Sequence, residues 1–217
     1  MAVIQIGSLS ILLKWVILGI AIIAGLVFIK VWLKVTHEKD SQKKIFDILS
    51  NGIFIGFVSW KASLLILEPQ LVLKSPLSLL YFTGGSDGLL IAVIITILFV
   101  FYKLKKMSLS EHQMIQIVLN YSLVVVGGYQ TLAAILLGTE TLYHVALGVI
   151  TFILLLFILI RKPSLNGLVN VMIIWLFIMV ILQLTLLPQS VRLFLFTMEQ
   201  WFFISLILIS WFYLNKK

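Results

Sequence analysis

Seven apolar runs dominate this sequence, and they restrict the chain to a fold that can cross a membrane repeatedly. A bilayer core about 30 Å thick needs roughly 20 helical residues per crossing. The chain has 217 residues, of which 62% are hydrophobic and 11% charged. A soluble domain is about half apolar and about a quarter charged, so this composition excludes one. We therefore predict an all-α integral membrane protein with a single polytopic domain (1–217) and seven transmembrane helices, over 10–33, 45–67, 86–104, 112–137, 141–160, 168–187 and 193–214.

Basic residues gather at alternate ends of these runs. Only Lys74 and Arg192 lie in loops on one side, whereas cytoplasmic loops of membrane proteins carry an excess of Lys and Arg. The pattern therefore predicts an N-terminus outside and a cytoplasmic C-terminus. It attributes the net charge of +8 to topology and anionic-lipid contact, not to nucleic-acid binding. Most of the 16 basic residues fall on the predicted cytoplasmic side: Lys30, Lys34, Lys39, Lys43, Lys44, Lys103, Lys105, Lys106, Arg161, Lys162, Lys216 and Lys217.

A glycine-rich stretch, Thr83–Gly88, lies directly before the third run. Gly84, Gly85 and Gly88 have no side chain to shield the backbone, so another group can come close. A helix that begins here directs unpaired N–H groups and a partial positive charge toward the stretch, which suits an anion. The alternative is that Ser86 or Asp87 only caps the helix. The third run is long enough to cross a membrane only if its helix begins within this stretch.

Lys61 lies inside the second run, about two helical turns before Glu68, which is roughly 10 Å at 1.5 Å per residue. A lysine at the centre of a span costs about 2.5–3.5 kcal/mol. It can reach the headgroups past Trp60, pair with an acid, or bind a lipid phosphate, and the sequence leaves these alternatives open. The Gly52-x-x-x-Gly56 spacing in the same run indicates close packing against another helix.

Further polar residues gather toward the outer ends of the runs. Lys14 is expected to extend to the interface, as lysines near helix ends do. The chain has no cysteine and its three histidines lack metal-ligand spacing, so we expect no metal site and no cofactor. The other polar or ionisable residues toward the outer side are Tyr129, Gln130, Thr131, Glu140, His144 and Glu199.

Several of these stretches resemble motifs of the bacterial prolipoprotein diacylglyceryl transferases, over roughly the first 135 residues. Ile4–Leu9 resembles the start of the family's first span, and Lys61 falls where members carry an arginine. The stretch SPLSLLYFTGGSDGLLIA is similar to the family's glycine-rich motif, with Asp87-Gly88 at its His-Gly position. Gly127–Leu132 is similar to the G-R-x-G-N-F signature. The resemblance implies seven spans with an outside N-terminus.

The chain departs from the family at the positions that carry its chemistry. Asp87 stands for the motif histidine, Gly128 for the signature arginine and Thr131 for the asparagine, and the family's outer subdomain is missing after the fourth run. The resemblance thus implies a catalytically degenerate relative with an outer-leaflet phosphatidylglycerol groove. It also implies an accessory or lipid-binding role, with a lipoprotein or another membrane protein as a further partner. The expected groove residues are Lys61, Gly84, Gly85, Ser86, Gly88, Tyr129, Gln130, Lys14, Glu199 and His144.

Two other functions stay open at this point. One is an active transferase that moves diacylglyceryl from phosphatidylglycerol to a lipoprotein cysteine, or acts on a different lipid or acceptor. Asp87 would be its catalytic residue, with Glu199 or His144 as the other residues in altered roles. The other is a small-solute permease or the membrane subunit of a transporter, although little polar matter lies in the inner half of the runs. In each case the expected location is the bacterial cytoplasmic membrane.

Overall fold

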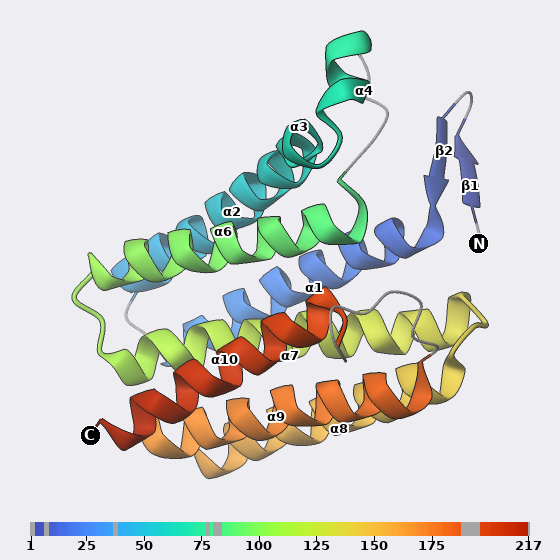
Figure 1. Ribbon diagram of the computed structural model, residues 1–217. Helices are drawn as coiled ribbons and strands as arrows, with labels where there is room; N and C mark the ends of the chain where they lie inside the picture. Colours follow the sequence, from blue (N-terminus) through green and yellow to red (C-terminus); the bar gives the residue numbers. More distant parts are fainter. Residues whose placement is uncertain are drawn as a thin grey trace. The chain divides into compact units, whose positions relative to one another are not determined.

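The computed structural model describes residues 3–6, 9–36, 39–76, 79, 84–187 and 196–216 (Figure 1). These residues are almost entirely helical, so the predicted all-α class is confirmed. Two short strands, β1 (Val3–Ile6) and β2 (Leu9–Leu12), precede the helices. The helices are α1 (Leu13–Thr36), α2 (Lys39–Ala62), α3 (Leu64–Leu67), α4 (Pro69–Lys74), α6 (Gly85–Lys105), α7 (Glu111–Leu136), α8 (Thr141–Arg161), α9 (Leu165–Leu186) and α10 (Met198–Asn215).

Six helical segments within the described residues are long and apolar enough to cross a membrane, which makes this a multi-pass membrane protein. Helix α10 is not among them, because Glu199, Gln200 and Asn215 near its ends lower its mean hydropathy. The seventh span and the orientation of the termini therefore stay predictions. The six segments are Leu13–Thr36, Ser41–Leu67, Gly85–Lys105, Glu111–Leu136, Thr141–Arg161 and Leu165–Leu186.

Helix α6 begins at Gly85, inside the glycine-rich stretch, and so reaches 21 residues. This confirms the condition under which the third run crosses a membrane. Helix α1 begins later than expected, because Leu9–Leu12 pairs antiparallel with Val3–Ile6. The hairpin was not predicted, although Gly-Ser between two β-branched, apolar segments is a signal for one. Gly7 and Ser8 themselves lie outside the described residues.

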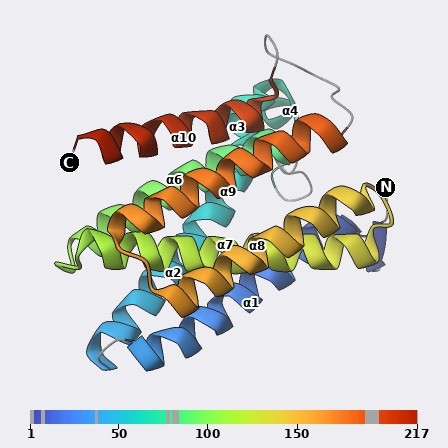
Figure 2. The same ribbon diagram turned by 90° about the horizontal axis from the view of Figure 1, so that it is seen from below.

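The chain divides into two compact units, 33–110 and the combination of 1–32 with 111–217. In the larger unit, α7, α8 and α9 pack against one another and α10 packs on α9 (Figure 2). Its core consists of apolar side chains from α7, α8 and α9. In the smaller unit, α2 packs along α6. The prediction of a single polytopic domain stays a prediction. Within this core, Leu123, Leu147, Ile158 and Leu168 are fully buried.

Candidate functional site

The two helices of the smaller unit approach each other closely at Gly52 and Gly56, which confirms the packing predicted from their spacing. A Cβ at Gly52 would lie 2.7 Å from Cγ2 of Val100, and one at Gly56 would collide with Oγ1 of Thr96. The Thr96 hydroxyl donates to the carbonyl of Gly52 at 3.3 Å. The sequence predicted a close partner helix but did not identify it as α6.

The glycine-rich stretch continues the same interface at the other end of the helix pair. A Cβ at Gly84 or Gly88 would collide with Oγ of Ser63 in the turn between α2 and α3. Gly85 has φ +64°, a left-handed conformation that favours glycine. The Trp60 indole N–H donates to the carbonyl of Gly85 at 2.9 Å. Two of the three glycines thus allow the helices to meet, and the third supplies the left-handed conformation at the start of α6.

Ser86 and Asp87 are exposed in the first turn of α6. The interpretation that one of them caps the helix is wrong, because Gly84 occupies the N-cap position and no side chain caps this end. The positive φ of Gly85 places the helix start before both residues. A negative charge at Asp87 interacts favourably with the N-terminal end of the helix dipole.

Lys61 lies in the last turn of α2, partly buried and directly after Trp60. Lys61 lies between Trp60 and Ser63 in the chain, and the side chains of both neighbours meet the start of α6. A cationic residue thus lies in the segment of α2 that packs at the positive end of the α6 dipole, and an anion site uses both kinds of group. We name this group the Lys61 cluster, and its members are Lys61, Gly84, Gly85, Ser86, Asp87 and Gly88.

A second set of expected residues comes together in the larger unit. His144 of α8 forms a hydrogen bond through Nδ1 to Oε1 of Gln130 on α7, and each residue is only 6% exposed. The rings of Tyr129 and Tyr143 lie edge-on to His144, with centroids 6.4 and 5.4 Å from that of the imidazole. The pair joins α7 to α8 inside the unit.

Gln183, Thr151 and Trp175 form further buried hydrogen bonds in this unit, and the sequence reasoning missed them. Gln183 of α9 is hydrogen-bonded to Tyr143, and the Trp175 indole N–H donates to Oγ1 of Thr151 at 3.1 Å. Such bonds between spans stabilise helix packing in a membrane. The available signal was an amide or a hydroxyl within an otherwise apolar run. Since the groups bond mainly to one another, the network tightens the packing of α7, α8 and α9.

Lys14 and Glu199 lie at helix starts in the larger unit. The Lys14 ammonium lies 4.6 Å from the centroid of the Trp15 ring, in the first turn of α1. Glu199 is exposed in the first turn of α10, whereas the predicted span over 193–214 places it more than one turn inside. Thr197 and Gln200 form a capping box there, with hydrogen bonds of 3.3 and 3.0 Å. The Thr-x-x-Gln spacing was the signal for this start.

The positions aligned with the transferase signature have other roles in this chain. A Cβ at Gly128 would lie 3.8 Å from Cβ of Ala21 on α1, so this position faces a packed helix. The Thr131 hydroxyl donates to the carbonyl of Gly127 at 2.9 Å. In the described part of the chain, no cluster of three or more His, Asp or Glu residues has the arrangement of a metal site.

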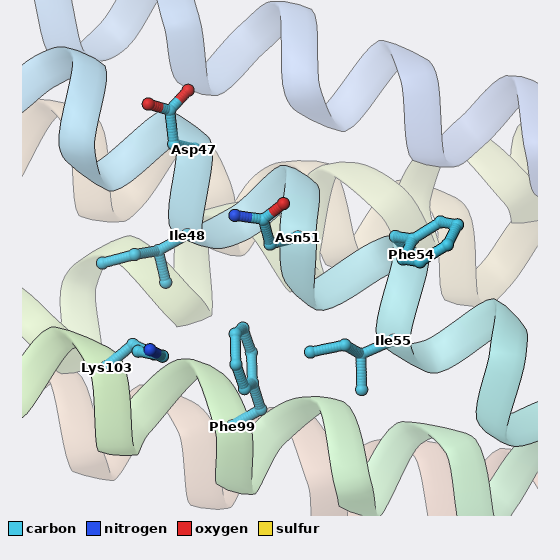
Figure 3. A pocket seen from close by; sticks show the side chains of 7 residues that line it. All are labelled: Asp47, Ile48, Asn51, Phe54, Ile55, Phe99 and Lys103. Carbon is cyan, nitrogen blue, oxygen red and sulfur yellow. The ribbon is translucent and has the colours of Figure 1, made fainter.

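A cavity of about 300 Å³ lies between α2 and α6, toward the end of the pair where α2 begins and α6 ends. None of its residues was a predicted site residue. The sequence feature that could have indicated this cavity is the pair of polar residues, Asp47 and Asn51, near the start of the second apolar run. Figure 3 shows the residues that line the cavity: Asp47, Ile48, Asn51, Phe54, Ile55, Phe99 and Lys103.

Comparison of the chain with models of protein families, with curated proteins and with solved structures finds no match. The likeness to the diacylglyceryl transferases therefore rests on the residues quoted from the sequence and stays a prediction.

Proposed function

We propose that this protein is a non-catalytic, phospholipid-binding relative of the diacylglyceryl transferases. It spans the bacterial cytoplasmic membrane seven times, with its N-terminus outside and its C-terminus in the cytoplasm. The observation that carries the proposal is that Lys61 follows Trp60, whose indole N–H donates to the carbonyl of Gly85 at the start of α6.

The Lys61 cluster suits the single phosphate of phosphatidylglycerol. An ammonium group is a compact charge with three donors, and the N-terminus of α6 supplies further N–H groups and a partial positive charge. The chain orientation predicted from the basic loops places this end of α2 in the outer leaflet. Lys61 cannot form the bidentate contact of the family's arginine, so we expect weaker phosphate binding than in a transferase.

The same residues support the absence of catalysis. Transfer to a lipoprotein cysteine needs a base that takes the thiol proton. Asp87 stands where the family has histidine, and its exposed carboxylate carries the wrong charge to hold a phosphate. Gly128 faces Ala21 on α1, and the hydroxyl of Thr131 is engaged by its own helix. We infer an accessory role in which bound lipid is presented to, or kept from, a membrane protein partner.

Expression in a bacterial host depleted of its own diacylglyceryl transferase tests the catalytic part. We expect no restoration of lipoprotein lipidation, while the protein purified from the same cells carries intact phosphatidylglycerol. The host transferase, expressed from the same vector, is the positive control. Restored lipidation at ordinary expression would show an active enzyme, and purification without phospholipid would favour the permease.

A further inference from the structure

The cavity between α2 and α6 lies at the opposite end of this helix pair from the Lys61 cluster. We propose that it binds a second phospholipid, a zwitterionic aminophospholipid whose headgroup carries both a phosphate and a primary ammonium. With the C-terminus in the cytoplasm, as proposed above, this lipid lies in the cytoplasmic leaflet. Neither the cavity nor its lining depends on that assignment.

The lining residues change from polar to apolar along both helices in the same direction. Asp47, Asn51 and Ile55 follow one another at successive turns of α2, and roughly 12 Å of helix separates the first from the last. On α6, which runs antiparallel, Lys103 and Phe99 are one turn apart. This order matches a phospholipid, with its headgroup at the polar end and its acyl chains beyond.

Apolar side chains continue the surface beyond the cavity. Phe54 at the cavity is 67% exposed, and Phe57 and Val58 in the next turn of α2 are exposed as well. Ile95 is the exposed apolar residue one turn beyond Phe99 on α6. Acyl chains that leave the cavity therefore meet an apolar surface toward the membrane centre.

The charged residues at the polar end are complementary to a zwitterion. Ile48, Asn51 and Ile55 come from α2, and Phe99 and Lys103 from α6, as Figure 3 shows. The Asp47 carboxylate is directed away from Phe99, so it lies at the rim on the α2 side. Neither Asp47 nor Lys103 forms an ion pair with another described residue.

These positions assign the two headgroup charges. The Lys103 ammonium and the Asn51 amide N–H take the phosphate in the cavity, and the Asp47 carboxylate takes the ammonium at the rim. An ammonium with N–H donors forms charge-assisted hydrogen bonds to a carboxylate. A choline headgroup has no N–H to donate, and a phosphatidylglycerol headgroup offers no cation. We therefore expect phosphatidylethanolamine to bind in preference to both.

Native mass spectrometry of the full chain, equilibrated with equal amounts of phosphatidylethanolamine, phosphatidylcholine and phosphatidylglycerol, tests this. Asp47→Asn should lower phosphatidylethanolamine retention roughly three- to tenfold, as loss of one hydrogen bond of ordinary strength at an exposed carboxylate implies, and remove the preference over phosphatidylcholine. Lys103→Ala should lower retention of phosphatidylethanolamine and phosphatidylcholine alike. Ile55→Trp, which fills the cavity, should lower both without any change of charge.

Matched controls are Glu68→Gln directly before α4 and Lys105→Ala in the last turn of α6, since neither residue lines the cavity. Both should retain lipid as the unaltered protein does, and thermal unfolding checks that every variant is folded. The proposal is wrong if Asp47→Asn leaves the lipid preference unchanged, or if Ile55→Trp and Lys103→Ala retain as much lipid as the controls. Lys61→Ala should leave phosphatidylethanolamine retention intact. The proposal for this cavity and the proposal for the Lys61 cluster are therefore tested independently.

Discussion

Asn120 of α7 is fully buried, and both polar atoms of its side chain have no hydrogen-bond partner within the described residues. An amide in this state costs about 1–3 kcal/mol relative to one that is hydrogen-bonded. The buried residues one turn from Asn120 on the same helix, Ile117, Leu123 and Val124, are apolar. Asn120 therefore weakens the packing of the larger unit.

We expect Asn120→Leu to raise the free energy of unfolding by about 1 kcal/mol, because an apolar side chain with the same number and branching of heavy atoms removes the unpartnered amide. Unfolding in a mixed detergent titration measures the change, and circular dichroism confirms that the helix content is unchanged. A loss of stability would show that Asn120 has a partner after all, such as a bound water.

Residue identities in the sequence predicted some of these roles and not others. Gly52 and Gly56 indicated a close helix contact because only their small size permits one, and the structure confirms it. The contact of Gly84 and Gly88 with Ser63 was not predicted, because residue spacing along one helix does not identify the residue that it packs against. Tyr129, Gln130 and His144 were expected at a lipid groove, and the structure shows Gln130 and His144 buried and hydrogen-bonded to each other.

At the scale of elements, α2 and α6 pack through a stripe of small residues. On α6 this stripe includes Gly88, Ala92 and Thr96, each one turn from the next. Small side chains let helix backbones approach closely in a membrane, where van der Waals packing replaces the hydrophobic effect as the driving force. The glycine-rich stretch is therefore a packing element as well as part of the candidate site.

Gly88→Ala should destabilise the smaller unit by about 1–3 kcal/mol, the usual cost of overpacking, because the added methyl group collides with Oγ of Ser63. Ser63→Ala in the same chain should restore most of the loss, since it removes the colliding oxygen. Thermal unfolding of the single and double variants measures both effects. Gly19→Ala on α1 is the matched control, because no other side chain lies within 4 Å of its added Cβ. Equal stability of Gly88→Ala and Gly19→Ala would contradict the packing role.

The apolar runs predicted where most helices lie, since their length and composition leave few other structures in a membrane. The pairing of Val3–Ile6 with Leu9–Leu12 was missed, because a short apolar segment next to a long apolar run shows no separate alternation of apolar and polar residues. The start of α10 was misplaced by several residues, because an apolar stretch before Thr197 concealed the capping box. Residues 188–195 lie outside the described part of the chain.

At the scale of the whole molecule, the number of spans and the side of each terminus are linked. An N-terminus outside and a C-terminus in the cytoplasm require an odd number of crossings. The described helices supply six segments that meet the length and hydropathy of a span, so α10 decides the parity. The basic loops predict this topology from the sequence alone.

Tags inserted at several positions test the topology. We expect tags at the N-terminus and between Gln70 and Ser75 to react with an impermeant reagent from outside, and tags near Lys39, Lys105 and Lys217 to react only after permeabilisation. The basic loops are the physical reason for this orientation. An accessible tag at Lys217 together with an accessible N-terminus would mean that α10 does not cross. A cytoplasmic N-terminus would overturn both the charge interpretation and the family resemblance.

The most direct test of the central claim measures how much phosphatidylglycerol remains bound to the purified protein and to its Lys61→Ala variant. We expect the unaltered protein to retain it, and Lys61→Ala to lose most of it without a change in thermal stability. Lys74→Ala, which removes an exposed lysine at the end of α4, should behave as the unaltered protein. If Lys61 instead pairs with Asp87, Lys61→Ala should destabilise the protein by about 3–5 kcal/mol and Asp87→Asn should partly rescue it. That result, or equal phosphatidylglycerol retention with and without Lys61, would contradict the account.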